Sequence, residues 1–304
     1  MSVPRLNWHD HKSDPEGFAR ALGECCRDTG FFLLENHGVS QGLRMQVFDQ
    51  ATAFFAQPEA AKRPLSIATN PHNRGWAYLG SESLDDTSEQ IDRKEAFNIG
   101  LDLSADDPRV LRAEPFRGVN LWPDLPDFRD TMLAYFDAVW ALGASLLQPV
   151  ARDLGLPPDH FEPHFTAPMA TLRLLSYPAA SGTEGEIGAG AHTDYGALTL
   201  LLTDGIAGLQ VRPRGADEWQ DVPHVADAFI VNIGDCLMRW TNDIYVSTPH
   251  RVLPPKHARQ SVAFFFDPNP DSLVSALPGT GEAKYPPVTG AAYLQSRLAA
   301  TYKA

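Results

Sequence analysis

The second half of the chain contains the stretch Ala191-His192-Thr193-Asp194-Tyr195-Gly196-Ala197-Leu198-Thr199-Leu200-Leu201. Side chains two residues apart on a β-strand point to the same face, so His192 and Asp194 can present an imidazole and a carboxylate to one point. A second His-any-acid triplet, His160-Phe161-Glu162, lies between prolines with no strand after it. The triplet alone is therefore a weak signal, and its meaning depends on a third group.

His250 supplies such a third group. It follows the first stretch after another predicted strand, a Gly234-Asp235 turn and a further loop, which leaves enough chain to fold back antiparallel. Two imidazoles and one carboxylate on one side of a metal form the facial triad of non-haem Fe(II) oxygenases, which leaves positions open for substrate and O2. Zn(II) accepts the same ligand types, so the three residues do not by themselves select the metal.

A candidate carboxylate site lies just beyond His250. The sequence Arg259-Gln260-Ser261 begins an apolar run, and strand alternation puts Arg259 and Ser261 on one face. A guanidinium with a hydroxyl beside it is suited to binding a carboxylate. A surface arginine at a strand edge is the plain alternative, and the closeness of His250 in sequence favours the carboxylate site.

Short β-type runs fill the C-terminal half, separated by clusters of Gly, Pro, Asn and Asp. The runs cover residues 171–177, 192–202, 208–211, 228–233 and 261–266. Many short strands with turn signals between them are typical of an antiparallel all-β architecture. We therefore expect a compact antiparallel barrel or jelly roll here.

Two helices are expected in the N-terminal half. The capping-box pattern Ser13-Asp-Pro-Glu16 predicts the start of the first, with a buried strand over 31–36 after Gly30. The second is expected over 127–153, with a break or kink near its end at Pro149. The first helix has a single apolar stripe, on or beside which two adjacent cysteines act as small apolar fillers: Phe18, Ala21, Leu22, Cys25 and Cys26.

Composition restricts the possible partners. The chain has 304 residues, 43% hydrophobic and 21% charged, as expected for a globular protein. Its formal net charge of -13 disfavours a nucleic-acid partner, because such a surface repels polyanions. The 3 cysteines form neither a disulfide framework nor a zinc ribbon, and the chain shows no secretory signal and no long uninterrupted apolar run. We expect a cytoplasmic protein without a membrane partner.

Further motifs occur in a fixed order along nearly the whole chain. In the N-terminal half they are Asp28-Thr-Gly-Phe-Phe-Leu-Leu-Glu-Asn-His-Gly-Val39, Phe54-Phe-Ala-Gln-Pro58 with Lys62, Arg74-Gly75-Trp76 and Asp92-Arg-Lys-Glu-Ala-Phe97. In the C-terminal half they are Arg173-Leu-Leu-Ser-Tyr-Pro178, the His192 stretch, Asn232-Ile-Gly-Asp235, Trp240-Thr-Asn242, His250-Arg-Val252 and Arg259-Gln-Ser261. In order and spacing these motifs resemble the isopenicillin N synthase-like branch of the Fe(II) and 2-oxoglutarate-dependent dioxygenases.

The resemblance implies a mainly β fold with surrounding helices, built on a double-stranded β-helix of the cupin-like jelly-roll type. It also implies that His192, Asp194 and His250 bind Fe(II) and carry catalysis through the metal. The chain would then be an enzyme, a non-haem iron dioxygenase that uses 2-oxoglutarate and O2. None of the motifs identifies its substrate.

The resemblance also assigns a cosubstrate site. Arg259 and Ser261 would hold the distal carboxylate of 2-oxoglutarate, and Tyr177 matches the family tyrosine that helps to hold it. Leu175 departs from the pattern, because many plant members carry asparagine two residues before that tyrosine. Part of the cosubstrate's hydrogen bonding must then come from elsewhere.

The expected reaction is oxidation, in the first place hydroxylation, of a small molecule, with decarboxylation of 2-oxoglutarate to succinate and CO2. Desaturation or cyclisation can replace hydroxylation in such enzymes. One alternative is an iron oxidase of the same family that uses O2 without 2-oxoglutarate. A second is a non-catalytic jelly-roll protein that binds a carboxylate or a metal, and a third is a zinc hydrolase, for which no extra general base is evident near the triad.

Two residues are candidates for the substrate side of the site. Arg173 lies on a strand that approaches the metal face, where it can pair either with an anionic substrate group or with a neighbouring carboxylate. Phe266, with Phe264 and Leu200, can line the site or belong to the plain core. The polar, loop-like segment 66–107 is typical of a cover over a site, and within it residues 70–100 are the expected specificity region.

We expect one compact structural unit with four regions. These are a dioxygenase N-terminal region over 1–120, a long helix and connector over 121–165, the Fe(II)/2-oxoglutarate core over 166–275 and a helical tail over 276–304. His37 is expected to cap local backbone, and Asp235 and Asn242 to shape turns or support the ligands. The sequence carries no signal of oligomeric state.

Overall fold

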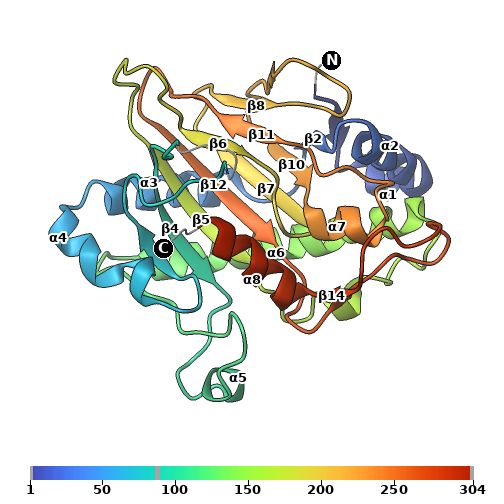
Figure 1. Ribbon diagram of the computed structural model, residues 1–304, viewed down its shortest axis with the longest axis horizontal. Helices are drawn as coiled ribbons and strands as arrows, with labels where there is room; N and C mark the ends of the chain where they lie inside the picture. Colours follow the sequence, from blue (N-terminus) through green and yellow to red (C-terminus); the bar gives the residue numbers. More distant parts are fainter. Residues whose placement is uncertain (1–2, 86–89, 302–304) are drawn as a thin grey trace.

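Two β-sheets face each other at the centre of the protein (Figure 1). The structure, a computed structural model, describes residues 3–85 and 90–301. Over these residues the main sheet has eight strands in the order β1-β2-β10-β7-β12-β5-β4-β3, and the second sheet has four in the order β6-β11-β8-β9. The predicted jelly-roll core with surrounding helices is confirmed.

Most strand pairs are antiparallel, and β1 with β2 is the parallel exception in the main sheet. The main sheet consists of β1 (Arg5–Asn7), β2 (Phe31–Glu35), β3 (Gly75–Ala77), β4 (Glu95–Gly100), β5 (Thr171–Tyr177), β7 (Leu198–Thr203), β10 (Phe229–Ile233) and β12 (Arg259–Phe266). The second sheet consists of β6 (Ala189–His192), β8 (Leu209–Val211), β9 (Gln220–Asp221) and β11 (His250–Val252). A separate pair is formed by β13 (Leu273–Val274) and β14 (Val288–Thr289).

Helices cover both faces of the main sheet, with α6 behind it and α8 in front of it in the view of Figure 1. The helices are α1 (Asp10–Ser13), α2 (Pro15–Asp28), α3 (Gln41–Phe55), α4 (Glu59–Lys62), α5 (Pro108–Leu111), α6 (Phe128–Asp153), α7 (Asp235–Trp240) and α8 (Gly290–Thr301). Short 3-10 turns lie at Arg63–Leu65, Ile67–Thr69 and Glu162–His164.

Strand β12 separates the outer core from the space between the sheets. Its even-numbered apolar residues face outward toward α6, where the Phe264 ring lies 5.0 Å from the Phe136 ring. The Phe266 ring lies 4.5 Å from the ring of Phe165. Its odd-numbered residues line the inner space between the sheets: Arg259, Ser261, Ala263 and Phe265.

The predicted site lining is therefore wrong for Phe266, Phe264 and Leu200, which are all buried in the outer core. The reason is the two-residue period of a strand, since Phe266 lies an odd number of positions after Ser261 and must point to the opposite face. Phe265 and Leu201 take the inner positions instead.

Helix α2 starts one residue later than the capping box predicts. Asp14, not Ser13, is its N-cap, and the Asp14 carboxylate accepts a hydrogen bond from the Gly17 amide. Cys25 and Cys26 are buried free thiols on this helix, which confirms their predicted role as apolar fillers.

Helix α6 is not broken at Pro149 and continues to Asp153. Proline removes a single backbone donor, and here that loss falls close to the end of a long helix whose last residue is firmly held. The Asp153 carboxylate accepts hydrogen bonds from the Arg27 guanidinium at 2.6 and 3.0 Å and from the Tyr245 hydroxyl at 2.7 Å. These contacts from distant segments offset the weakened helix end.

By length and mean hydropathy alone, α6 is also apolar enough to cross a membrane, the single such helix in the described chain. Half of its most apolar window is buried inside the protein. Core helices pass the same test because an apolar face is needed for packing as well as for contact with lipid.

The segment 66–107 is only partly the loop that its composition predicts. Strand β3 and strand β4 join the main sheet, and Phe97 and Ile99 on β4 are fully buried in the core. Between these strands, Glu82, Leu84 and Lys94 contribute to the lining of the inner space. The long β-type run over 192–202 is also divided, since β6 ends at His192 and β7 begins at Leu198.

Replacing Phe264 with alanine should destabilise the protein by about 3–5 kcal/mol, because it leaves a cavity in the packed outer core. Phe265→Ala, on the partly exposed inner face of the same strand, is the matched control and should cost less. Urea unfolding of both variants measures the difference. A larger loss for Phe265→Ala would contradict the assignment of the two faces.

Candidate active site

A cavity lies between the two sheets, and it contains the predicted triad together with Arg259 and Ser261. Its walls come from both sheets, and α8 closes one side with Leu294 and Leu298. Residues that are far apart in the sequence therefore meet in one enclosed space. The geometry of each group decides what that space can bind.

The two histidines of the triad are direct neighbours in the second sheet. His250 on β11 is the antiparallel Cα partner of His192 on β6, and their ring centroids lie 4.3 Å apart. Side chains of directly opposed residues stand on the same face of a sheet. The pairing of the two strands thus brings the imidazoles together.

Backbone carbonyls fix both imidazoles. The Nδ1 atom of His192 lies 2.7 Å from the Gly190 oxygen, and Nδ1 of His250 lies 3.1 Å from the Thr248 oxygen. Each contact places the ring proton on Nδ1, which leaves the Nε2 lone pair free to bind a metal. Burial, followed by the charge of His250, lowers the pKa of His192 and favours the neutral, ligating form.

Asp194 is held by the other sheet. Its Oδ2 atom accepts hydrogen bonds from the Thr199 hydroxyl at 2.6 Å and the Asn232 amide at 2.7 Å. Thr199 on β7 and Asn232 on β10 are themselves cross-strand Cα partners. The Oδ1 atom is turned the other way, 3.6 Å from Nε2 of His250 and 3.9 Å from Nε2 of His192.

The structure corrects the predicted reason for this arrangement. Asp194 does not share a strand with His192, because the chain leaves β6 there and crosses to the main sheet. The crossing is tight: a Cβ atom on Gly234 would lie 2.3 Å from the Gly196 oxygen. The backbone amide of Asp235 donates to the backbone oxygen of Asp194 at 2.8 Å. This hydrogen bond holds the crossing segment against the loop that contains Gly234 and Asp235.

The three atoms that remain available, two Nε2 and one Oδ1, lie within 4.8 Å of one another. Their other polar atoms are already engaged by hydrogen bonds, as is usual for metal ligands. Two nitrogens and one carboxylate oxygen on one side of an ion leave further coordination positions open, which fits a non-haem Fe(II) centre. The residues present therefore fit the predicted iron.

Arg259 is buried, with 1% of its surface exposed, at the start of β12. Its Nε donates to the Ile206 oxygen at 3.1 Å, its Nη1 donates to the Ser261 hydroxyl at 3.4 Å, and its Cζ lies 4.9 Å from the centre of the Tyr177 ring. No carboxylate forms an ion pair with Arg259 among the described residues. A buried cation in this state is suited to an anionic ligand.

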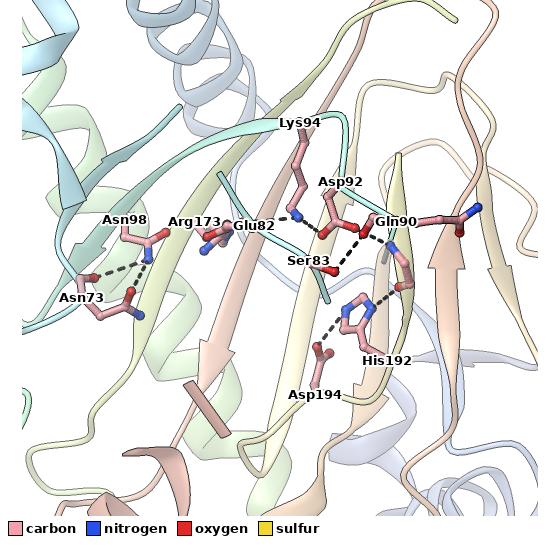
Figure 2. Close-up of polar contacts among 11 residues, drawn as sticks. Asn73, Glu82, Ser83, Gln90, Asp92, Lys94, Asn98, Arg173, His192 and Asp194 are labelled. Carbon is pink, nitrogen blue, oxygen red and sulfur yellow. Dashed lines mark hydrogen bonds and ion pairs between the residues drawn. The ribbon is translucent and has the colours of Figure 1, made fainter. Parts of the chain in front are cut away.

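The other arginine of the cavity is in a different state. Arg173 on β5 forms an ion pair with the carboxylate of Glu82. Of the two predicted partners for Arg173, the structure therefore contains the neighbouring carboxylate. The Lys94 ammonium lies 3.3 Å from the same carboxylate and also pairs with Asp92 (Figure 2). These four charged side chains form a buried cluster, which we call the charged strap.

The charged strap reaches the iron ligands through the backbone. Oδ1 of Asp92 accepts a hydrogen bond from the Gly190 amide at 2.8 Å, and the Gly190 oxygen in turn faces His192 (Figure 2). The sequence analysis missed this role of Asp92, although the motif Asp92-Arg-Lys-Glu-Ala-Phe97 contains it. The expected specificity region 70–100 also includes residues 86–89, which lie outside the described residues.

The remaining polar residues singled out in the sequence have structural contacts. Nδ1 of His37 accepts from the Val39 amide at 3.1 Å, which confirms a backbone cap. The Asp235 carboxylate accepts from the Tyr293 hydroxyl at 2.8 Å, next to the crossing loop. Asn242 adopts a positive φ of 53° and donates to two carbonyls of a neighbouring loop, at 2.9 and 2.8 Å.

Comparison with known families agrees with this geometry. Residues 3–125 match the family described as non-haem dioxygenase in morphine synthesis N-terminal, and residues 159–268 match the 2OG-Fe(II) oxygenase superfamily. The chain belongs to the 2OG-Fe(II) oxygenase superfamily. This confirms the predicted family and enzyme class, and Fe(II), 2-oxoglutarate and O2 are its cofactors and cosubstrates.

Similar proteins cover nearly the same length. A 2-oxoglutarate-Fe(II) type oxidoreductase of Emericella nidulans is 38% identical over 88% of this chain and 79% of its own. A proline hydroxylase of Petromyces alliaceus is 33% identical over 99% of this chain and 100% of its own. A Neurospora crassa protein solved in complex with alpha-KG and thymine has a TM-score of 0.87 and 30% identity, covering 98% of this chain and 96% of the other.

Thr199→Val should weaken metal binding, because Asp194 loses one of the two donors that orient it. Loss of such a supporting hydrogen bond typically lowers metal affinity about tenfold to a hundredfold. Anaerobic calorimetric titration with Fe(II) measures the effect. Thr203→Val, four residues along the same strand, is the control and should bind iron normally. Equal Fe(II) affinity in both variants would show that the hydrogen bond from Thr199 to Asp194 is not needed for metal binding.

Asp267 is a further buried carboxylate that lines the cavity. Burial, and then the charge of Asp194, raise its pKa from 3.8 to about 7, against an opposing effect of Arg74. Because the folded-state pKa is above the unfolded value, the folded state holds the proton more tightly. Ionisation of Asp267 therefore reduces the stability of the metal-free protein as the pH rises from about 4 to about 7.

Asp267→Asn should remove this pH dependence. The variant should gain stability relative to the unchanged protein as the pH rises through that window, with an upper limit on the order of 4 kcal/mol. Urea unfolding of both metal-free proteins at pH 4.5, 6 and 8 measures the difference. A stability difference that stays constant with pH would contradict the raised pKa of Asp267.

Proposed function

We propose that this protein hydroxylates a small molecule in a reaction that consumes O2 and 2-oxoglutarate. One observation carries the proposal: three unengaged ligand atoms and a buried arginine without a described carboxylate partner open into the same cavity. The first group suits Fe(II), and the second suits the distal carboxylate of a keto acid. A protein that only bound a carboxylate would have no use for an open metal position.

When bound, Fe(II) supplies the activation of O2 that is coupled to decarboxylation of 2-oxoglutarate. His192, Asp194 and His250 would hold it. The carbonyls of Gly190 and Thr248 keep the two imidazoles in the ligating tautomer. The protein thus contributes fixed ligands that need little rearrangement when the metal binds.

The cosubstrate would lie along β12. Arg259 and Ser261 would hold its distal carboxylate. The guanidinium of Arg259 packs over the Tyr177 ring. Leu175, where many plant members have asparagine, adds apolar surface beside Ser261, its Cα partner on the neighbouring strand. The Ser261 hydroxyl, the Arg259 guanidinium and the Tyr177 hydroxyl are then the polar groups that would orient the cosubstrate.

Apolar side chains form part of the cavity wall. Phe265 and Leu201 line the floor, and Leu294 and Leu298 of α8 line one wall. Exclusion of water protects reactive species and strengthens polar contacts inside the site. Thymine in the complex of the Neurospora crassa protein, and the name of the proline hydroxylase, support a small molecule as the substrate class.

The test is succinate production by the Fe(II)-loaded protein with 2-oxoglutarate and O2. Succinate should form only when both iron and 2-oxoglutarate are present. Oxygen uptake that is unaffected by omitting 2-oxoglutarate would favour the iron oxidase alternative. Absence of Fe(II) binding would favour the non-catalytic alternative.

Arg259→Ala should weaken the apparent affinity for 2-oxoglutarate about tenfold to a hundredfold while Fe(II) still binds. The physical reason is the loss of a charge-assisted contact of roughly 1.5–3 kcal/mol. Succinate formation against 2-oxoglutarate concentration, with iron binding measured in parallel, tests this. Arg129→Ala, which removes an exposed arginine paired with Asp102, is the control and should behave as the unchanged protein. Unchanged 2-oxoglutarate affinity in Arg259→Ala would mean that the arginine has another role.

A further inference from the structure

Asn98 has an unusual environment on the wall of the cavity. It lies on β4, is 1% exposed and is the antiparallel Cα partner of Arg173 on β5. Its Nδ2 donates to the backbone and side-chain oxygens of Asn73, both at 3.3 Å (Figure 2). Its Oδ1 has no hydrogen-bond partner within the described part of the chain.

The orientation of the Asn98 amide is determined by these contacts. Rotating it by half a turn would place Oδ1 against two oxygens of Asn73, where no proton is available for a hydrogen bond. The Nδ2 group is therefore committed to Asn73, and Oδ1 is left as a buried acceptor. A buried acceptor without a partner is unfavourable in the folded protein, so a ligand that donates to it is favoured.

The charges nearby argue for a neutral ligand. In the charged strap, the acids Glu82 and Asp92 are matched by the bases Lys94 and Arg173 through contacts between opposite charges. An anionic ligand bound here would compete with Glu82 for both cations. Arg259 shows the contrasting case, a buried cation whose described hydrogen-bond partners are a carbonyl and a hydroxyl.

The register places this acceptor on the inner face of the sheet whose strand β7 carries a residue that holds Asp194. Asn98, Arg173, Ala263 and Leu201 form one row across β4, β5, β12 and β7. Adjacent strands are about 4.8 Å apart, so Asn98 lies roughly 14 Å across the sheet from β7. Strand β7 also carries Thr199, which holds Asp194. A small ring held at Asn98 would thus extend toward the triad.

We propose that Asn98 is a specificity-determining residue, and that the substrate is a neutral cyclic amide or imide whose N–H donates to Asn98 Oδ1. The proposal rests on the proposed function, because it assigns a substrate class to the same cavity. An amide N–H only donates, which matches an isolated acceptor. A carboxylate offers no proton at neutral pH and so cannot donate to this acceptor.

The test compares three probes of similar size on the protein loaded with Fe(II) and 2-oxoglutarate without O2. The probes are glutarimide, N-methylglutarimide and cyclohexanecarboxylate, and dissociation constants come from the change in the visible absorption of the iron complex. Glutarimide should bind at least about tenfold more tightly than the N-methyl compound, which lacks the N–H. It should also bind more tightly than the carboxylate.

Asn98→Leu should bring the ratio of the two imide affinities to about one. Asn73→Gly is the matched variant: glycine accepts the φ of 59° at this position, and the backbone oxygen still holds Asn98, so the ratio should persist. Because the ratio is internal to each protein, partial loss of stability does not change its meaning. The comparison on the unchanged protein requires no variant at all.

Equal affinity for the two imides in the unchanged protein would overturn the proposal, as would a ratio that survives in Asn98→Leu. Tighter binding of the carboxylate than of glutarimide would overturn the neutral class. The proposed function fails in a different way, since 2-oxoglutarate would then produce no visible absorption band with the iron-loaded protein. The two failures are thus distinguishable in one experiment.

Discussion

The carboxylate of Asp194 must face two ways, and the rest of the site depends on this. One oxygen is bound by Thr199 and Asn232 of the main sheet, and the other is turned to the histidines of the second sheet. The carboxylate is thus a polar link between two sheets that otherwise meet through side-chain packing. The sheets can hold a metal only when their separation and register bring all three ligand atoms together, so the jelly roll is itself part of the metal site.

The two-residue period of a strand explains why the predicted carboxylate site is correct and why the predicted site lining is wrong for Phe266. The rule that placed Arg259 and Ser261 on one face also excludes Phe266 from it, and the structure follows the rule at all three positions. The division between β6 and β7 was harder to predict, because apolar residues continue across it and Gly196 is a single weak signal. Because both sheets bury apolar residues, an apolar run in the sequence does not reveal where the chain passes from one sheet to the other.

The charged strap could not be predicted from local sequence. Three of its four residues lie in a polar segment that is typical of a surface loop, yet these three, Glu82, Asp92 and Lys94, are buried. Burial of such groups is tolerated only when each finds a partner, and the partners are contributed by β5 and β6, far along the chain. A single sequence shows the charges but not their pairing. The triad was predictable because a motif marks it, and the strap was not because only the fold assembles it.

The two arginines that line the cavity, Arg173 and Arg259, differ in their contacts. Arg173 has its counter-charge within the fold, so its environment is complete before any ligand binds. Arg259 has polar neighbours but no described carboxylate, so a ligand that brings one relieves an electrostatic cost that the fold leaves in place. Ligands that bind only the folded state stabilise it, which ties occupancy of the Arg259 site to the stability of β12. Since β12 also carries Ser261 and Phe265, filling the cosubstrate end of the cavity would stabilise the strand that lines its substrate end.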